Sequence, residues 1–374
     1  MHLILGGGIA GLYQAYMLES KGHKDITIIE KESTLGGRIQ TKKYDSIMYE
    51  TGPSKILPSH KKTLALLKEL DLKQFLKKVP NGKAIKMSVY NNLRNYIIKK
   101  GLTKKMLNKM SLNELLVSVD PKYVDLIEST GYPHLLECES HSGVKYVKDL
   151  CSAQFYVLTC GLSAIIDRLT ERLQDTEIKT NTSITKIDIK SKQVHCFSKN
   201  KQVKYKYDTL YISIPPKQII DNRLINKPYL GFVEKIITIP LVRIFGASSG
   251  SGLGNTKYPY KVMEDKSDPV QRHVSLTSNF HQVVYASNNN ARFWEKLAKK
   301  EISDKVHIPV KTNTIMKYYW DSGIHLMVST DNTTDNTTDN TNKKPVSLPR
   351  NVKLIGESYN PYKRWIESAI QSCF

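Results

Sequence analysis

The sequence lacks several patterns that mark secreted, zinc-binding or membrane-spanning proteins. It has only five cysteines in 374 residues, and no two of them form a C-x-x-C pair. An odd number at such spacings argues against a disulfide framework and a zinc site, and fits a reducing compartment. No apolar run approaches the ~18 residues that a membrane helix requires. The apolar start has no basic n-region, so we expect no signal peptide, no metal and no membrane span.

Acidic residues are also scarce relative to basic ones. The chain has 56 Lys and Arg against 35 Asp and Glu, a formal charge of +21, and no dense acidic cluster. The positive charge is densest from Ile97 to Lys109, "IIKKGLTKKMLNK". We favour a solvated basic face; the alternative is a surface that attracts nucleic acid, anionic lipid or an anionic substrate. No nucleic-acid-binding module accompanies it, so a nucleic-acid partner is the less favoured hypothesis.

The amino-acid usage carries a weaker indication of source. Lys, Asn, Ile and Tyr are frequent, which is typical of an AT-rich genome such as that of a large DNA virus or a protist. We therefore expect a cytoplasmic protein, located in the host cytoplasm or the virion if the source is viral.

Three glycines stand together near the start of the chain. Leu3 to Leu5 is a short apolar run typical of a buried strand, and apolar residues recur at helical spacing from Ile9. Between them, Gly6, Gly8 and Gly11 form a G-x-G-x-x-G pattern. In such a turn the glycines permit the bend, the approach of a pyrophosphate and close packing of helix on strand, while the helix N-terminus binds the phosphate charge.

A second strand follows the predicted helix. "DITIIE" is apolar and β-branched, and it ends at Glu30, roughly twenty residues after the glycines. A dinucleotide-binding fold places an acidic residue at this point to bind the ribose hydroxyls. The pattern therefore predicts an α/β fold with a Rossmann-like dinucleotide-binding domain.

A second glycine pair makes the resemblance specific. The segment Gly6 to Thr41, which includes Gly36, Gly37 and Arg38, resembles the FAD fingerprint of the flavin-containing amine oxidase superfamily (monoamine and polyamine oxidases, and also protoporphyrinogen oxidases and carotenoid desaturases). The resemblance implies a glutathione-reductase-like flavoprotein in which Gly-Gly-Arg closes over the cofactor phosphates. "YETGPSKI" is similar to the segment that passes the flavin, which implies contacts from Gly52, Pro53 and Ser54.

Later segments match the superfamily's returns to the FAD-binding domain. A helix is expected over Cys160 to Leu173, followed by strands in which Ile184 would bind adenine through its backbone. We predict that residues 1–70, 150–220 and 345–374 form a discontinuous FAD-binding domain. Residues 71–149 and 221–344 would form a second, mixed α+β substrate domain, with 329–345 as a low-complexity loop. After Pro58, "HKKTLALLKELDLKQFLKK" is predicted to form helices.

The C-terminal segment resembles the superfamily's closing motif. Gly356-Glu357 follows a predicted strand, and Trp365-Ile366-Glu367 begins a helix. In the family this helix directs its N-terminus at the flavin, which implies cofactor contacts from Glu357, Trp365 and Ile366. Arg364 and Ser368 stand where the family usually has glycine, and both add atoms close to the expected flavin ring.

The resemblance also implies where the chemistry would occur. Amine oxidases of this family place two aromatic residues beside the flavin as a cage; Trp365 matches one position and His325 the other, and we take both as the candidate catalytic residues. Ile324 stands where covalent members have cysteine, so FAD should be non-covalent. The family's lysine near flavin N5 has no clear match; Arg243 and Lys261 lie in the corresponding regions.

These observations predict an FAD-dependent oxidoreductase. The expected reaction is hydride transfer from a C–N bond of a small molecule to flavin N5, with O2 as acceptor. One alternative is another flavoenzyme on the same scaffold, such as a protoporphyrinogen oxidase, desaturase or UDP-sugar mutase. An anionic substrate fits the positive charge of the chain better than a polyamine does. The other alternative is a non-catalytic flavoprotein that binds nucleic acid or a virion partner through its basic face.

Overall fold

The computed structural model describes residues 1–81, 84–233, 236–248, 260–262, 267–328, 347–360 and 365–373. The chain divides into two compact units. Unit 1 comprises Met1–Val79, Phe155–Ile237 and Thr333–Phe374, and unit 2 comprises Pro80–Gln154 and Thr238–Asn332. The predicted low-complexity loop, 329–345, lies outside the described residues. The predicted domain boundaries stay a prediction.

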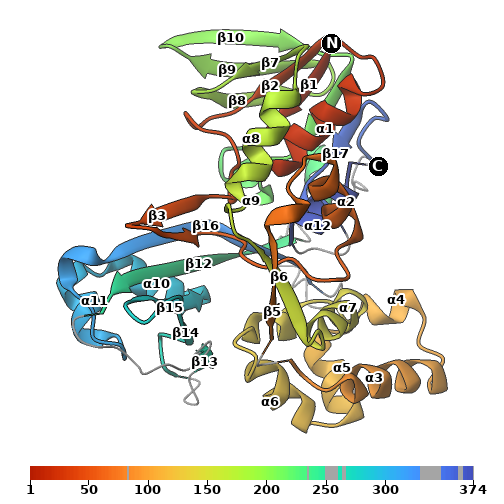
Figure 1. Cartoon of the computed structure of the whole chain (residues 1–374). Coiled ribbons are helices and arrows are strands. Elements are labelled where there is room, and N and C mark those ends of the chain that lie inside the picture. Colours follow the sequence, from red (N-terminus) through yellow and green to blue (C-terminus); the bar gives the residue numbers. More distant parts are fainter. Residues whose placement is uncertain are drawn as a thin grey trace. The chain divides into compact units, whose positions relative to one another are not determined.

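Unit 1 is built on a five-stranded sheet in the order β17-β11-β1-β2-β7 (Figure 1). Every adjacent pair in this sheet is parallel. The strands are β1 (His2–Leu5), β2 (Ile26–Ile29), β7 (Thr176–Lys179), β11 (Thr209–Ile212) and β17 (Val352–Leu354). The central strands are apolar because both faces of a parallel sheet are covered. The predicted α/β class is confirmed.

Helices from distant parts of the sequence cover one face of this sheet. They are α1 (Ile9–Glu19), α2 (Lys61–Glu69), α8 (Ser163–Arg172) and α12 (Trp365–Gln371). Their apolar residues share one core with β1 and β2, in which Ile4, Leu12, Ile28 and Leu169 are completely buried. The other face packs against the antiparallel sheet of β8 (Thr182–Asp188), β9 (Gln193–Ser198) and β10 (Lys201–Lys206), and against α9 (Pro216–Asp221).

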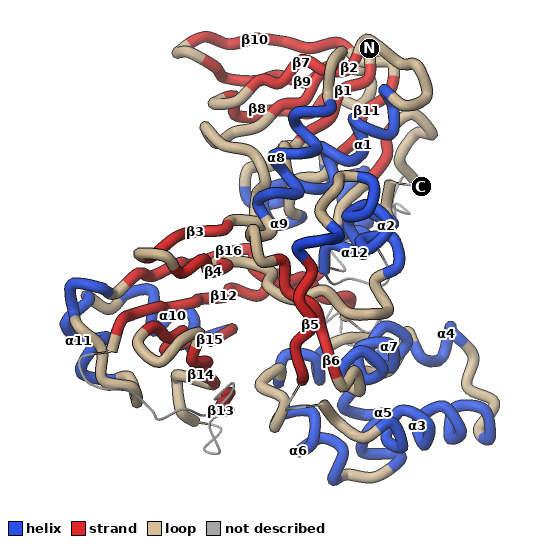
Figure 2. The backbone as a smooth tube through the Cα atoms, viewed as in Figure 1, coloured by secondary structure: helices blue, strands red, loops and turns tan. Residues whose placement is uncertain are grey.

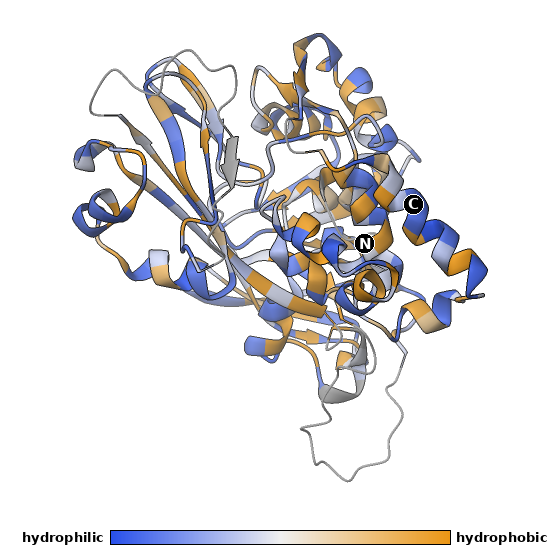
Figure 3. Ribbon diagram, turned by 90° about the horizontal axis from the view of Figure 1, so that it is seen from below, coloured by the Kyte–Doolittle hydropathy of each residue, from blue (hydrophilic) through white to orange (hydrophobic). Residues whose placement is uncertain are grey.

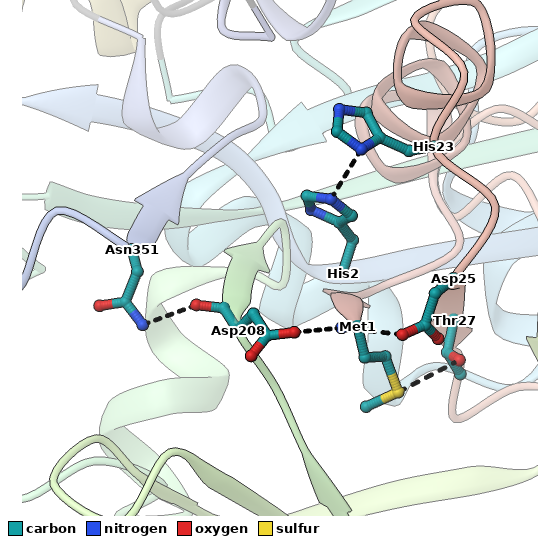
Figure 4. A network of polar contacts seen from close by, with 7 residues as sticks. All are labelled: Met1, His2, His23, Asp25, Thr27, Asp208 and Asn351. Carbon is teal, nitrogen blue, oxygen red and sulfur yellow. Dashed lines mark hydrogen bonds and ion pairs between the residues drawn. The ribbon is translucent and has the colours of Figure 1, made fainter.

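A polar network joins the amino ends of four strands of this sheet (Figure 4). The Met1 ammonium pairs with Asp25 at 2.8 Å and also with Asp208. These two carboxylates precede β2 and β11, and their hydrogen bonds with the ammonium raise its pKa. Asn351, which precedes β17, donates its side-chain amide to the Asp208 carbonyl at 2.8 Å. The network lies at the end of the sheet opposite to the glycine-rich turn. It therefore connects the strands at a distance from the candidate site.

One sequence prediction in unit 1 is wrong. The segment after Pro58 is not helical throughout, because α2 ends at Glu69 and the chain then forms a short 3-10 turn, Lys73–Phe75, and strand β5 (Leu76–Pro80). Asp71 adopts a left-handed conformation, φ 59°, which ends a right-handed helix. β5 pairs with β6 (Gln154–Leu158), and β3 (Thr41–Tyr44) pairs with β4 (Ile47–Glu50).

Unit 2 combines a helical part with a mainly antiparallel sheet (Figure 2). The helices of the first part are α3 (Met87–Lys99), α4 (Lys104–Leu107), α5 (Leu112–Val119), α6 (Lys122–Glu128) and α7 (Ser140–Leu150). The sheet has the order β13-β14-β15-β12-β16. Its strands are β12 (Ile236–Ala247), β13 (Tyr260–Val262), β14 (Arg272–Ser275), β15 (Phe280–Ser287) and β16 (Met316–Met327), and α10 (Asn288–Lys296) and α11 (Lys299–Lys305) follow β15.

Apolar and polar residues are interleaved along the helices and strands (Figure 3). In unit 2, β12 and β15 bury Val242, Ile244 and Val284 against Trp294 of α10. None of the helices described here is long and apolar enough to cross a bilayer. No disulfide joins the five cysteines, all of which lie in the described ranges.

Candidate functional site

The turn between β1 and α1 brings the helix unusually close to the strand. A Cβ atom at Gly11 would lie 2.0 Å from the Gly6 carbonyl oxygen, so only glycine permits this packing. Gly8 is the N-cap of α1 and gives it no side-chain capping bond. The first N–H groups of a helix have no intrahelical acceptor, and here they coincide with the positive end of the helix dipole. This terminus therefore suits an anionic ligand.

Gly8 faces open space, and the second glycine pair lies beside it. A Cβ added at Gly8 would meet no atom within 4 Å. Gly8 forms a bridge with Gly36, and the Gly36 N–H donates to the Gly7 carbonyl at 2.9 Å. A Cβ at Gly37 would lie 3.7 Å from the Gly8 Cα. The two predicted phosphate-binding motifs thus form one side-chain-free surface that a ligand's phosphates can approach.

Glu30 lies at the carboxyl end of β2, as predicted, and is buried, with 8% exposure. Its Oε2 accepts from the Gly7 N–H at 2.7 Å and its Oε1 from the Glu32 N–H at 2.9 Å. A carboxylate oxygen accepts more than one hydrogen bond, so both retain capacity for hydroxyl donors. Glu30 therefore fixes the glycine turn and fits the predicted role at the ribose.

Arg38 connects the second glycine pair to the C-terminal segment. Its guanidinium donates to the Glu357 carboxylate at 2.8 Å, and Glu357 is buried. A Cβ at Gly52 would lie 1.9 Å from the Arg38 carbonyl oxygen, so Gly52 packs directly on this residue. The structure thus brings together the three segments around Gly36, Gly52 and Glu357.

Three further residues of unit 1, Pro53, Ser54 and Ile184, are also predicted to contact the cofactor. Pro53 and Ser54 are half-buried. Ile184 lies in β8, whose first residue, Thr182, donates its N–H to the Glu30 carbonyl at 2.9 Å. Ile184 is therefore on the strand that begins beside Glu30, and its predicted backbone contact with adenine stays a prediction.

The C-terminal helix α12 carries two of the predicted cofactor contacts, Trp365 and Ile366. Ile366 is buried in the core of unit 1, and its predicted contact with the cofactor stays a prediction. Trp365 begins α12, but its side chain lies outside the described part of the chain, as does Arg364. Neither the cage role of Trp365 nor the effect of Arg364 is therefore tested.

Glu367 has a structural role that the sequence did not reveal. Its carboxylate accepts from the backbone N–H groups of Lys62 and Thr63 at 3.0 and 2.7 Å, and from the Thr63 hydroxyl at 2.8 Å. It caps the N-terminus of α2 across 305 residues of sequence. A Glu within a helical segment gives no signal of a partner so distant in the chain.

The predicted site residues of unit 2 lie on its sheet. His325 is completely buried in β16. Arg243, in β12, is also buried and donates two hydrogen bonds to the Gln282 carboxamide oxygen, at 3.0 and 2.5 Å. The side chain of Lys261 is outside the described residues. Arg243 is thus already bound to Gln282, and the family's lysine has no assigned equivalent.

The residues of unit 1 fit FAD. The cradle combines an uncapped helix N-terminus, an open face at Gly8, a buried acid and an arginine. An anionic pyrophosphate and a ribose diol require these donors and acceptors. No group of three or more His, Cys, Asp or Glu side chains suited to a metal occurs among the residues described.

Comparison with known proteins supports this assignment. Residues 9–156 match the family model of flavin-containing amine oxidoreductases. Coproporphyrinogen III oxidase of Bacillus subtilis is 35% identical over 79 residues, which are 20% of this chain and 17% of that protein. L-amino-acid oxidase of Crotalus adamanteus is 34% identical over 71 residues, 19% of this chain and 14% of that protein. The chain thus aligns with less than a fifth of either relative's length.

Two solved structures share the fold over the whole chain. A putative protoporphyrinogen oxidase from Exiguobacterium has a TM-score of 0.72 at 14% identity, covering 100% of this chain and 96% of that one. A fatty acid isomerase from P. acnes, which produces CLA, has a TM-score of 0.71 at 15% identity, with the same coverage. Residues 9–156 thus resemble flavin-containing amine oxidoreductases in sequence, and at these identities the two structures show that the fold is shared.

Proposed function

We propose that the protein is an FAD-dependent oxidoreductase that oxidises a C–N bond of a small molecule, with O2 as the electron acceptor. The observation that carries the proposal is the cradle of unit 1, in which the Gly8–Gly36 bridge and the Arg38–Glu357 pair join segments from both ends of the sequence. When bound, FAD supplies the hydride acceptor. Ile324 stands at the position of the family's linking cysteine, which supports non-covalent binding.

The chain's own residues would bind and orient the cofactor. The N–H groups at the start of α1 and the side-chain-free surface of Gly8 and Gly37 would hold the pyrophosphate. Glu30 would accept from the ribose hydroxyls. Arg38 would add positive charge beside the phosphates while Glu357 fixes its guanidinium. The proposed cage residues, His325 and Trp365, would orient the substrate.

Anaerobic mixing with candidate donors tests this proposal. The visible absorbance of bound FAD should fall on addition of the correct amine, and return with peroxide formation when O2 is admitted. L-Amino acids and polyamines form the first panel, since matched relatives are named L-amino-acid oxidases. Flavin that no amine reduces would refute oxidation of a C–N bond.

A second function is favoured by the charge of the chain. A formal charge of +21 attracts anions and repels polyamines at long range. Another flavoenzyme of this scaffold, acting on an anionic substrate, fits this field, and coproporphyrinogen III is a candidate because a matched relative is named for it. Reduction of the flavin by that porphyrinogen but by no amine would select this alternative.

A further inference from the structure

Unit 2 carries two arginines in one row across its sheet. Arg243 of β12 is opposite Tyr285 of β15, and Tyr285 is opposite Arg272 of β14. Their neighbours Val242 and Val284 belong to the apolar core beneath α10. Because side chains alternate between the faces of a sheet, the row Arg243–Tyr285–Arg272 lies on the face opposite to that core. Both arginines are buried, each with 6% exposure.

Aromatic rings fix the orientation of Arg272. Its guanidinium lies 3.3 Å from the ring centroid of Tyr285 and 4.4 Å from that of Tyr132. Stacking occupies the faces of a guanidinium and leaves its N–H groups directed outward in the plane. Arg272 therefore adds fixed positive charge to this face of the sheet.

Gln282 supplies a donor that lacks an acceptor. Arg243 donates to its Oε1 from Nε at 3.0 Å and from a terminal nitrogen at 2.5 Å. Because a guanidinium can only donate, the carboxamide oxygen must face Arg243, which settles the orientation of the amide. Its Nε2 then has no hydrogen-bond partner within the described ranges, although Gln282 is only 2% exposed. A buried donor without an acceptor is unfavourable for the folded protein, so the site favours an added acceptor.

We propose that Gln282 Nε2 and the guanidinium of Arg243 bind the carboxylate of a small molecule, with Arg272 contributing positive charge from the same row. A carboxylate supplies the acceptor that Gln282 needs, and arginine binds carboxylates with geometric specificity. The net charge of the chain favours the approach of such a ligand. The identification of this carboxylate as part of the oxidised substrate rests on the proposed function; the binding site itself does not.

Calorimetric titration of the full-length protein tests the site, with 3-phenylpropanoate as the probe and its neutral amide, 3-phenylpropanamide, as the control ligand. We expect saturable binding of the carboxylate and at least tenfold weaker binding of the amide. Gln282→Glu should weaken carboxylate binding by tenfold or more, because the new carboxylate pairs with Arg243. Lys296→Gln makes the same change in charge at an exposed position of α10 and should leave the affinity unchanged.

Gln282→Met keeps the experiment decisive if Gln282→Glu does not fold. It removes the donor without adding charge and should also weaken carboxylate binding by tenfold or more. Equal binding of carboxylate and amide, no saturable carboxylate binding, or an unchanged affinity in the folded variant would overturn the proposal. FAD titration is a separate readout, because the cradle for FAD is built by unit 1. If the protein binds the carboxylate but not FAD, only the proposed function is refuted. If it binds FAD but not the carboxylate, only this site is refuted.

Discussion

Replacing Gly8 with alanine separates ligand binding from folding. The backbone of Gly8 has φ −74° and ψ 178°, which alanine adopts without strain, and its Cβ would meet no atom within 4 Å. Reduced entropy of the unfolded chain stabilises the variant by about 0.4–1 kcal/mol. The poorer N-cap offsets this by a similar amount, so the stability of the flavin-free protein should change by less than about 0.5 kcal/mol.

The same methyl group occupies the surface that we assign to the pyrophosphate. It keeps ligand atoms about 3.5–4.0 Å from the new carbon, which separates the phosphate oxygens from the N–H groups of α1. The loss of one charge-assisted hydrogen bond, about 1.5–3 kcal/mol, weakens FAD binding by about 10- to 150-fold. Titration of flavin-free protein with FAD, followed by the quenching of flavin fluorescence, measures this change.

Gly11→Ala is the matched comparison within the same turn. Its Cβ would lie 2.0 Å from the Gly6 carbonyl oxygen, a backbone atom that cannot rotate away, so α1 must shift from β1. We expect this variant to lose about 1–3 kcal/mol of stability even without FAD. A Gly8→Ala protein that binds FAD as tightly as the parent, or that unfolds as readily as Gly11→Ala, would refute the assignment of the open surface to the ligand.

Two further predictions concern the stability of unit 1. Burial lowers the pKa of His60 to about 3, whereas the unfolded chain has a pKa of about 6.5; protonation of the unfolded state therefore removes about 2 kcal/mol of stability as pH falls from 7.5 to 5. His60→Asn keeps an acceptor for the Leu57 N–H and should remove this loss of unfolding free energy, as measured by urea unfolding at pH 7.5 and 5. A variant that loses as much stability as the parent between these pH values would contradict the role of His60. Glu367→Gln, which disrupts the cap on α2, should cost about 2–4 kcal/mol in urea unfolding. The surface change Glu171→Gln should cost less than about 0.5 kcal/mol. If Glu367→Gln costs no more than Glu171→Gln, the cap on α2 does not stabilise the protein.

The sequence predicted those features of the site that depend on local chemistry. The turn of Gly6, Gly8 and Gly11 could be located because a strand, a turn and a helix lie within a few residues of one another, and the position of Glu30 because β2 follows directly. The resemblance predicted that distant segments meet at the cofactor, but the direct contacts between their side chains could not be predicted. The Arg38–Glu357 pair spans 319 residues, and no local pattern specifies such a partner.

The sheet of unit 2 shows a second limit of the sequence. From the sequence, Arg243 was considered only as a possible match for the family's lysine. The structure places it beside Gln282 and in a row with Arg272. Which residues face each other depends on the register, and the register of β12 with β15 shifts between Ile244 and Phe245. A strand pattern alone does not reveal where such an irregularity occurs.

The most direct test of the account is the stoichiometry of FAD in the purified protein. Protein incubated with FAD and freed of excess by gel filtration should retain one flavin per chain, and denaturation should release that flavin into the filtrate, as non-covalent binding requires. Protein that leaves the column without visible absorbance after incubation with saturating FAD would contradict the central claim that unit 1 binds this cofactor.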